Sequence, residues 1–246
     1  MHQLQQLRAL ARNKEAVRPL AVDVAGDTAT VWLYDFIGHD PYTGTGISAE
    51  VFAKEIRSIT APNILLRINS PGGSVFDGRA MFSALQMHPA NKTALIEGVA
   101  ASAATSVAMA ADQVQMVQGA LFMIHRSWTV AMGNAEDLLA TAALLEKVDQ
   151  ALVQDYVGKT GADPQQVQDW MSAETWFTAE EAQAAGFVNS VVDGSAASAS
   201  WDLSLYAKAP EQNTSPAQDA PAADDENTAR WDRANNEIRL VEKTSA

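Results

Sequence analysis

Apolar runs that end in turns of very small residues, each followed by a helical pattern, constrain this chain most. Residues 63–69 form a near-continuous apolar run, and a Ser-Pro-Gly-Gly turn at 70–73 separates it from a helical pattern at 77–87. Residues 93–98 lead in the same way into a turn around Ser102 and an alanine-rich helical pattern. Strands that alternate with helices are typical of layered α/β folds with mostly parallel pairing. We therefore predict an α/β fold of this kind.

The remaining segments extend the same alternation. Ser48 and Asn134 stand where helix N-caps are expected. Further strands are predicted at residues 28–37, 113–118, 121–124 and 186–192. Further helices are predicted at residues 49–59, 135–157, 164–171 and 178–185.

Composition divides the 246 residues into three parts. Residues 1–19 have the pattern of a short amphipathic arm, and residues 20–194 carry the alternating pattern of a folded domain. From residue 195 to 246 the chain is first dominated by Ala, Ser, Pro, Asp and Gln, which is the composition of a linker. We predict a low-complexity C-terminal tail in which residues 228–243 could form a short helix.

Charge and cysteine content limit the partners. A net charge of −13 argues against nucleic acid, because phosphate binding needs a basic surface. The chain has no cysteine, which rules out disulfides and thiolate metal sites and fits a reducing compartment. The longest run of low polarity, residues 99–111, is too short for a membrane span. We expect a cytoplasmic protein that acts without a membrane, a metal or a cofactor.

A serine and a histidine are the strongest candidates for chemistry. Ser102 lies among very small residues at a predicted strand-to-helix turn, where its hydroxyl would be exposed beside free helix N–H groups. His125 ends the apolar run 120–124 and could take the proton of a serine nucleophile. The N–H groups of Gly73 and Ala103 could form an oxyanion hole. The alternative for each residue is structural: a helix cap, a tight turn or a buried histidine.

Four motifs carry a family resemblance. Residues 68–73, 98–103, 123–125 and 178–189 resemble, in the same order, segments of the Clp-type serine peptidases (ClpP). The resemblance covers roughly residues 20–194, and the four motifs together are specific. Residues 175–182 and the low-complexity extension resemble the ClpP-like head-maturation proteases of phages and prophages.

The resemblance implies a crotonase-like α/β fold and a site. Ser102 matches the nucleophile, His125 the general base, and Gly73 and Ala103 the oxyanion donors. The long helix 135–157 matches the protruding handle through which two rings of subunits dock. An amphipathic helix that is simply part of the core is the alternative.

The third catalytic residue departs from the family pattern. Glu174 stands where the family has its catalytic aspartate, and its extra methylene changes the reach of the carboxylate. Asp169, or a Ser–His pair without an acid, remains an alternative. The loop between His125 and Asn134 is also shorter than in the housekeeping members, which leaves ring interlocking and ATPase-dependent gating open.

The resemblance implies a serine endopeptidase that processes capsid or scaffold proteins in phage head maturation, as a homo-oligomeric ring. One alternative is an ATP-dependent Clp proteolytic subunit that works with an AAA+ unfoldase. Another is a catalytically weak assembly protein that uses its tail. A crotonase-type acyl-CoA enzyme would share the fold, but such enzymes do not need the Ser102–His125 pair.

Overall fold

The computed structural model describes residues 20–39, 46–194, 201 and 203–210. Contacts group Met1–Ala209 into one compact unit and Pro210–Ala246 into a second. The predicted arm at 1–19 and the predicted helix at 228–243 lie outside the described residues. The account below concerns the first unit.

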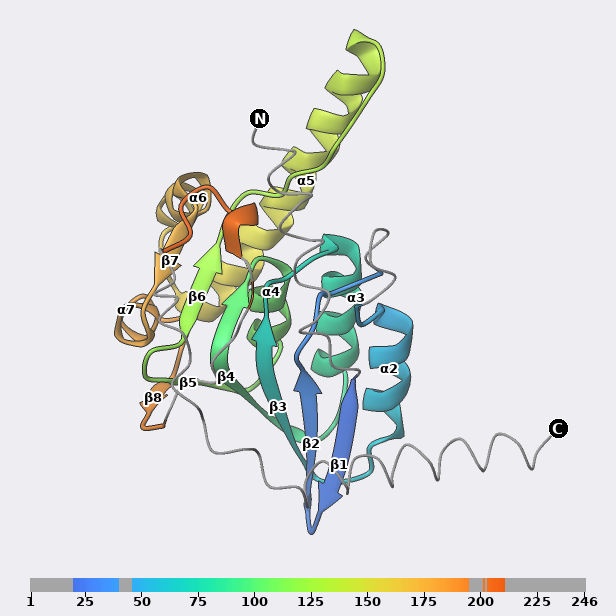
Figure 1. Cartoon of the computed structure of the whole chain (residues 1–246), viewed down its shortest axis with the longest axis vertical. Coiled ribbons are helices and arrows are strands. Elements are labelled where there is room, and N and C mark those ends of the chain that lie inside the picture. Colours follow the sequence, from blue (N-terminus) through green and yellow to red (C-terminus); the bar gives the residue numbers. More distant parts are fainter. Residues whose placement is uncertain (1–19, 40–45, 195–200, 202, 211–246) are drawn as a thin grey trace, which may run out of the picture. The chain divides into compact units, whose positions relative to one another are not determined.

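A mixed β-sheet forms the centre of this unit (Figure 1). Its main path has the strand order β1–β2–β3–β4–β5–β8, and β6 pairs with both β4 and β7. Pairing is parallel except between β1 and β2 and between β6 and β7. The described strands are β1 (Ala21–Ala25), β2 (Thr28–Leu33), β3 (Asn63–Ser70), β4 (Asn91–Ala101), β5 (Gln113–Val117), β6 (Leu121–Ile124), β7 (Thr175–Phe177) and β8 (Ser190–Val192).

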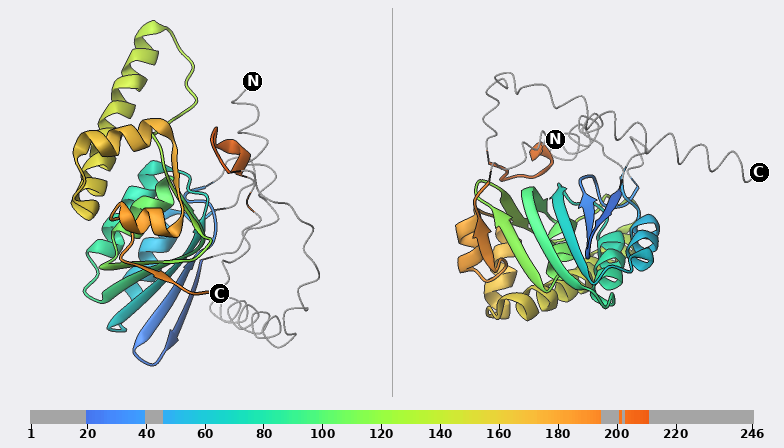
Figure 2. Two further views of the ribbon diagram at one scale, coloured as in Figure 1. Left: turned by 90° about the vertical axis from the view of Figure 1, so that its left-hand side faces the viewer. Right: turned by 90° about the horizontal axis from the view of Figure 1, so that it is seen from below.

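Helices α2 to α5 lie on one face of the sheet (Figure 2). A short 3-10 helix, η2, lies on the opposite face (Figure 2, right). The N-terminal part of α5 projects beyond the sheet (Figure 1). The described helices are α2 (Ala49–Ser58), α3 (Val75–Gln86), α4 (Ala103–Met109), α5 (Ala135–Thr160), α6 (Pro164–Ala173), α7 (Ala179–Ala184) and η2 (Leu203–Leu205).

The core lies between the sheet and these helices. Alternate residues of β3 point toward the helices, so that Ile64, Leu66 and Ile68 are buried. Every residue of α4 is buried as well. This helix contains mostly small side chains, which let it approach its neighbours closely: a Cβ added to Gly78 of α3 would lie 3.1 Å from the Cβ of Ala103. The position of α4 fixes the turn that precedes it.

The predicted α/β fold with mostly parallel strands is confirmed. Two short strands were not predicted: β1, which pairs only with β2, and β7, whose three residues pair with β6. The sequence predicts an end for this helix near residue 157, at Gly158 or Gly161; α5 runs to Thr160, and Gly161 provides its left-handed C-cap. None of the described helices is both long and apolar enough to cross a bilayer.

Part of the predicted tail belongs to the compact unit. The predicted domain boundary was residue 194, whereas the unit defined by contacts extends to Ala209. Four side chains of this stretch are buried on the sheet face that carries η2: Trp201, Leu203, Leu205 and Tyr206. They form an apolar cluster with Phe36, Val99, Ala101 and Met123.

Candidate active site

Ser102 occupies a strained turn between β4 and α4. Its backbone has φ 55° and ψ −124°, and only one other described non-glycine residue has a positive φ. The backbone N–H of Ser102 donates to the carbonyl oxygen of Met123 at 2.9 Å, which ties the turn to β6. Strain of this kind persists only where the surroundings enforce it, and it is concentrated at functional sites. The turn presents the hydroxyl at the start of a buried helix.

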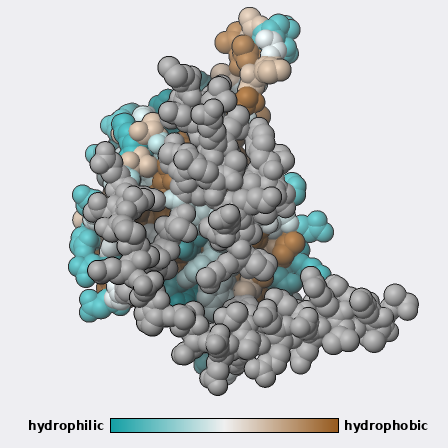
Figure 3. Space-filling view, viewed as in Figure 1, coloured by the Kyte–Doolittle hydropathy of each residue, from teal (hydrophilic) through white to brown (hydrophobic). Residues whose placement is uncertain are grey.

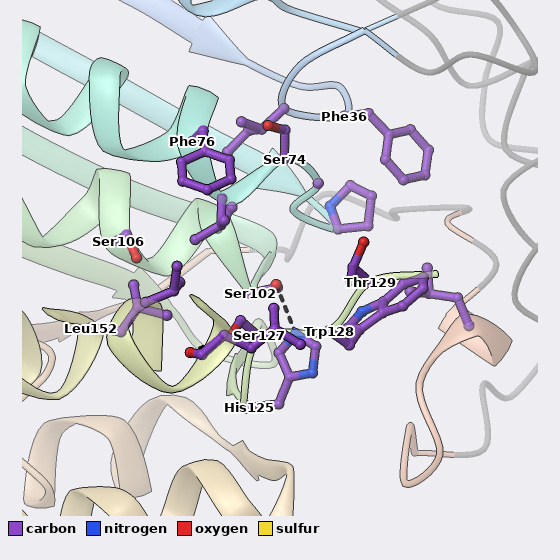
Figure 4. Close-up of a pocket in the computed structure, with 18 of the residues that line it drawn as sticks. Phe36, Ser74, Phe76, Ser102, Ser106, His125, Ser127, Trp128, Thr129 and Leu152 are labelled. Carbon is purple, nitrogen blue, oxygen red and sulfur yellow. Dashed lines mark hydrogen bonds between the residues drawn. The ribbon is translucent and has the colours of Figure 1, made fainter. Parts of the chain in front are cut away.

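His125 lies next to this hydroxyl. Strand β6 pairs in parallel with the end of β4, with Met123 opposite Ala101, and this register brings the residues that follow the two strands together. The Nε2 atom of His125 is 2.8 Å from the Oγ of Ser102 (Figure 4). When the serine hydroxyl donates to Nε2, the histidine proton is on Nδ1. This is the arrangement in which His125 can accept the serine proton.

Burial lowers the pKa of His125 from 6.5 to about 4. The negative charges of Glu174 and, to a smaller extent, Asp149 oppose this shift by favouring the protonated ring. The imidazole is therefore neutral at neutral pH. A neutral imidazole is the form that can act as a general base.

The two predicted oxyanion donors line the same pocket as Ser102. Among the described residues, neither the N–H of Gly73 nor that of Ala103 is engaged in a hydrogen bond. The Gly73 turn is fixed by hydrogen bonds that Ile37 makes with Gly72 (2.9 Å) and Ser74 (2.8 Å). Gly73 has φ 147°, and a Cβ there would lie 2.2 Å from the Ile37 oxygen, so only glycine fits. Two residues whose backbone N–H groups have no described acceptor thus line the cavity beside the serine.

Glu174 is near His125 but its carboxylate has other partners. It follows α6 as a C-cap with φ 51°. Its oxygens accept hydrogen bonds from the backbone N–H groups of Ala207, at 3.0 Å, and Lys208. Its only other described donor is the indole of Trp176, at 3.4 Å. Within the described part of the chain, Ser102 is the only hydrogen-bond partner of His125.

The alternative acid, Asp169, does not take this place. It is exposed on α6, where its Oδ1 accepts a hydrogen bond from Gln165 at 2.9 Å. The described residues also contain no group of three His, Cys, Asp or Glu side chains that could hold a metal ion.

Two residues near the site were missed in the sequence. Asp149 of α5 accepts hydrogen bonds from the N–H (2.7 Å) and the hydroxyl (2.6 Å) of Ser127, two residues after His125. A single carboxylate next to Val148, on an otherwise apolar helix face, could have indicated a buried polar contact in the sequence. Tyr206 lies in the low-complexity stretch, where no local pattern indicates a role.

A pocket of about 490 Å³ opens beside Ser102 (Figure 4). Most of its walls are apolar side chains from α3, α5 and the segment after His125. The hydroxyl of Ser106, one helical turn beyond Ser102, is buried there without a hydrogen-bond partner among the described residues. The apolar wall includes Phe36, Val75, Phe76, Trp128, Leu144, Leu145, Val148 and Leu152.

Comparison with known proteins points to one family. Residues 44–195 match the model of the family described as Clp protease. These residues are more than half of the chain and contain all the predicted site residues.

Several individual proteins agree with this match. The chain is 30% identical over 132 residues to ATP-dependent Clp protease proteolytic subunit 3 of Rhodococcus jostii, and 31% identical over 134 residues to subunit 1 of Protochlamydia amoebophila. Each alignment covers 53% of this chain and 65% of the relative, so just under two thirds of their length is spanned. The proteolytic subunit of Bacteroides fragilis is 28% identical over 155 residues, covering 62% of this chain and 74% of the relative.

A solved structure supports the fold. A point mutant of ClpP1 from Listeria monocytogenes superposes with a TM-score of 0.58 at 21% identity. The match covers 67% of this chain and 91% of that one.

Proposed function

The chain belongs to the Clp protease family, and we propose that it is a serine peptidase with Ser102 as nucleophile and His125 as general base. The observation that carries this proposal is the 2.8 Å contact between the two side chains at a strained turn. A nucleophile and a base within hydrogen-bond reach are the minimum unit of this chemistry.

The reaction follows from the positions of these groups. As the Oγ of Ser102 attacks the substrate carbonyl carbon, its proton passes to Nε2 of His125. The negative charge that develops on the carbonyl oxygen is stabilised by the N–H groups of Gly73 and Ala103. The intermediate expels the amine, which takes the proton from His125, and leaves an ester on Ser102. Water, activated by the same histidine, hydrolyses the ester and restores the serine.

The acid contributes in this proposal through its charge. Glu174 and Asp149 both favour the protonated histidine that forms during the reaction. Glu174 is held by two backbone N–H groups, so its charge is fixed near the ring without a hydrogen bond to it. We therefore propose a Ser–His pair supported by two nearby carboxylates, in which Glu174 acts through its charge and not as a hydrogen-bonded third member of a triad.

The pocket supports a preference among substrates. Its apolar walls lie beside Ser102, so an apolar substrate side chain next to the cleaved bond would bury its surface there. We propose cleavage after large apolar residues.

A fluorophosphonate probe tests the nucleophile directly. The wild-type protein is expected to gain one covalent adduct in its intact mass, and Ser102→Ala is expected to gain none. Ser83→Ala removes the exposed serine hydroxyl of α3 and is a matched control that should still be labelled. A folded wild-type protein without an adduct, or a labelled Ser102→Ala variant, would overturn the proposal.

An oligomer is the second part of the proposal. The projecting end of α5 carries hydrophobic surface beside hydrophilic surface (Figure 3). Leu138 and Leu139 of this helix are exposed. Met132, before the helix, is 92% exposed. Large apolar side chains that are exposed close together are typical of protein interfaces. We propose that this helix docks against other copies in a ring-shaped assembly, which native mass measurement of wild type and Leu139→Lys would test.

For the physiological substrate we propose capsid or scaffold proteins of a phage head, and the cytoplasm as the site of action. The support is the resemblance of residues 175–182 and of the C-terminal extension to head-maturation proteases. The relatives named above are instead called ATP-dependent. Cleavage of an unfolded protein without ATP or an unfoldase would favour the first proposal, and strict dependence on both would favour the second.

A further inference from the structure

Tyr206 contacts both sides of the candidate active site. Its hydroxyl donates a hydrogen bond to the carbonyl oxygen of Pro71, in the turn that carries Gly73. Its ring packs edge-on against His125, with 5.3 Å between ring centroids. Burial raises the pKa of the Tyr206 hydroxyl, and a contact with the Ser102 side chain opposes this shift. The hydroxyl therefore remains protonated, as a donor to Pro71 must.

The chain on both sides of Tyr206 is anchored to the domain. Upstream, the indole N–H of Trp201 donates to the Oδ1 of Asn69 at 3.2 Å, and its ring packs edge-on against Phe36 at 5.6 Å. Downstream, the backbone N–H groups of Ala207 and Lys208 bind the Glu174 carboxylate. The position of Tyr206 is thus fixed from two directions.

The segment forms a wall of the pocket and does not fill it. Leu205 and Tyr206 line the pocket together with Ser102, and a volume of about 490 Å³ remains beside them. The Ser102–His125 contact is present with the segment in place. A blocking segment would occupy this volume or separate the two side chains.

We propose that Tyr206 is a positioning residue of the active site, which holds the Pro71 carbonyl and the His125 ring in the geometry that serine attack requires. The proposal rests on the proposed function of Ser102 and His125. Catalysis of this kind is sensitive to small displacements of the reacting groups.

The two contacts of Tyr206 have separable consequences. Without its hydroxyl, the buried Pro71 carbonyl loses its donor, and the turn that carries Gly73 loses one of the hydrogen bonds that hold it. Without its ring, water reaches His125. The charged or titratable groups that face His125 among the described residues are Glu174, Asp149 and Tyr206 itself. Both carboxylates favour the protonated ring, so hydration can only raise the pKa of His125.

The test measures the rate constant of fluorophosphonate labelling at Ser102 as a function of pH, for folded protein only. Tyr206→Phe loses the hydroxyl, so we expect labelling about ten-fold slower, the scale of one lost positioning contact. Because this variant keeps the ring, the apparent pKa of His125 should be unchanged. Tyr206→Ala also exposes the histidine, so its apparent pKa should rise from about 4 toward 6.5. Tyr34→Phe, which loses a hydroxyl bonded to Glu97, is the matched control and should behave as wild type.

The outcomes separate the two proposals. A wild-type protein that is not labelled would overturn the proposed function. A labelled wild type with Tyr206→Phe within two-fold of its rate would overturn the positioning role alone. If Tyr206→Ala does not fold, the conservative Phe variant still decides. A purely structural tyrosine would lower the melting temperature without changing the labelling rate or its pH dependence.

Discussion

The Ser102 side and the Glu174 side of the candidate site are each built around a non-glycine residue with positive φ, Ser102 at 55° and Glu174 at 51°. The surroundings of the two residues differ. Ser102 joins a central strand to a fully buried helix, and its chain neighbours Ala101, Ala103 and Ala104 are buried. Glu174 ends a helix near the surface, and its carboxylate is held by residues more than 30 positions later in the chain.

The two geometries have different origins in the chain. The Ser102 turn is enforced by its own strand, its own helix and the adjacent glycine turn. The Glu174 carboxylate is placed by a segment outside the family match, which ends at residue 195. We therefore expect substitutions on the Ser102 side to reduce activity severely, and substitutions on the Glu174 side to reduce it less.

Among these substitutions, we expect Gly72→Ala to reduce activity most. A Cβ at Gly72, with φ +91°, would lie 2.4 Å from the Ala101 oxygen and 2.8 Å from the Cβ of Ser102. The turn must shift, and we expect about a 100-fold loss of peptidase activity, the scale of a misplaced reacting group. Activity would be measured as kcat/KM on an unfolded protein substrate.

Gly26→Ala is the matched control. Gly26 also has positive φ, at +62°, but a Cβ there would meet nothing within 4 Å. It should lose about 1–2 kcal/mol of stability from backbone strain, with activity unchanged. Equal activity of Gly72→Ala and Gly26→Ala would show that the Ser102 turn does not depend on the turn that contains Gly72.

Glu174→Gln should have an intermediate effect. The amide oxygen can still accept a backbone hydrogen bond, but the negative charge that favours the protonated His125 is lost. We expect about a ten-fold fall in kcat/KM, well below the loss that follows when a directly bonded triad acid is replaced. The pKa of His125 should fall further, because the carboxylate opposes the effect of burial.

The matched control is Asp169→Asn, which removes the same charge from the exposed face of α6 and should leave both quantities unchanged. A loss of several thousand-fold in Glu174→Gln would instead mean that Glu174 bonds His125 directly when substrate is bound.

We expect pH to have the smallest effect on activity near neutrality. Because burial lowers the pKa of His125 to about 4, kcat/KM should change by less than two-fold between about pH 6 and 8, and fall only below about pH 5. The unfolded chain, with an ordinary histidine pKa, binds a proton near pH 6.5 that the folded site does not. The contribution of His125 to stability is therefore lost as pH falls from about 6.5 toward 4. An acid limb near 6.5 in the activity profile would contradict the burial of the ring.

Most of the sheet and its helices were predictable from local patterns. The β3 and β4 runs, the caps at Ser48 and Asn134, and the small-residue turns are each contained within a few consecutive residues. The three residues of β7 were not predictable, because they become a strand only by pairing with β6.

The site divides along the same line. The residues of the Ser102 and Gly73 turns are evident from the sequence, since a turn beside a buried helix admits only small residues and positive φ favours glycine. The partners of Glu174 and the position of Tyr206 become known only from the folded structure. Those contacts join residues that are 33 to 135 positions apart, and no local periodicity records them. The apolar side chains of residues 201–206 bury their surface against the apolar sheet face around Phe36, Val99 and Met123. This packing places Tyr206, and it depends on the folded chain as a whole.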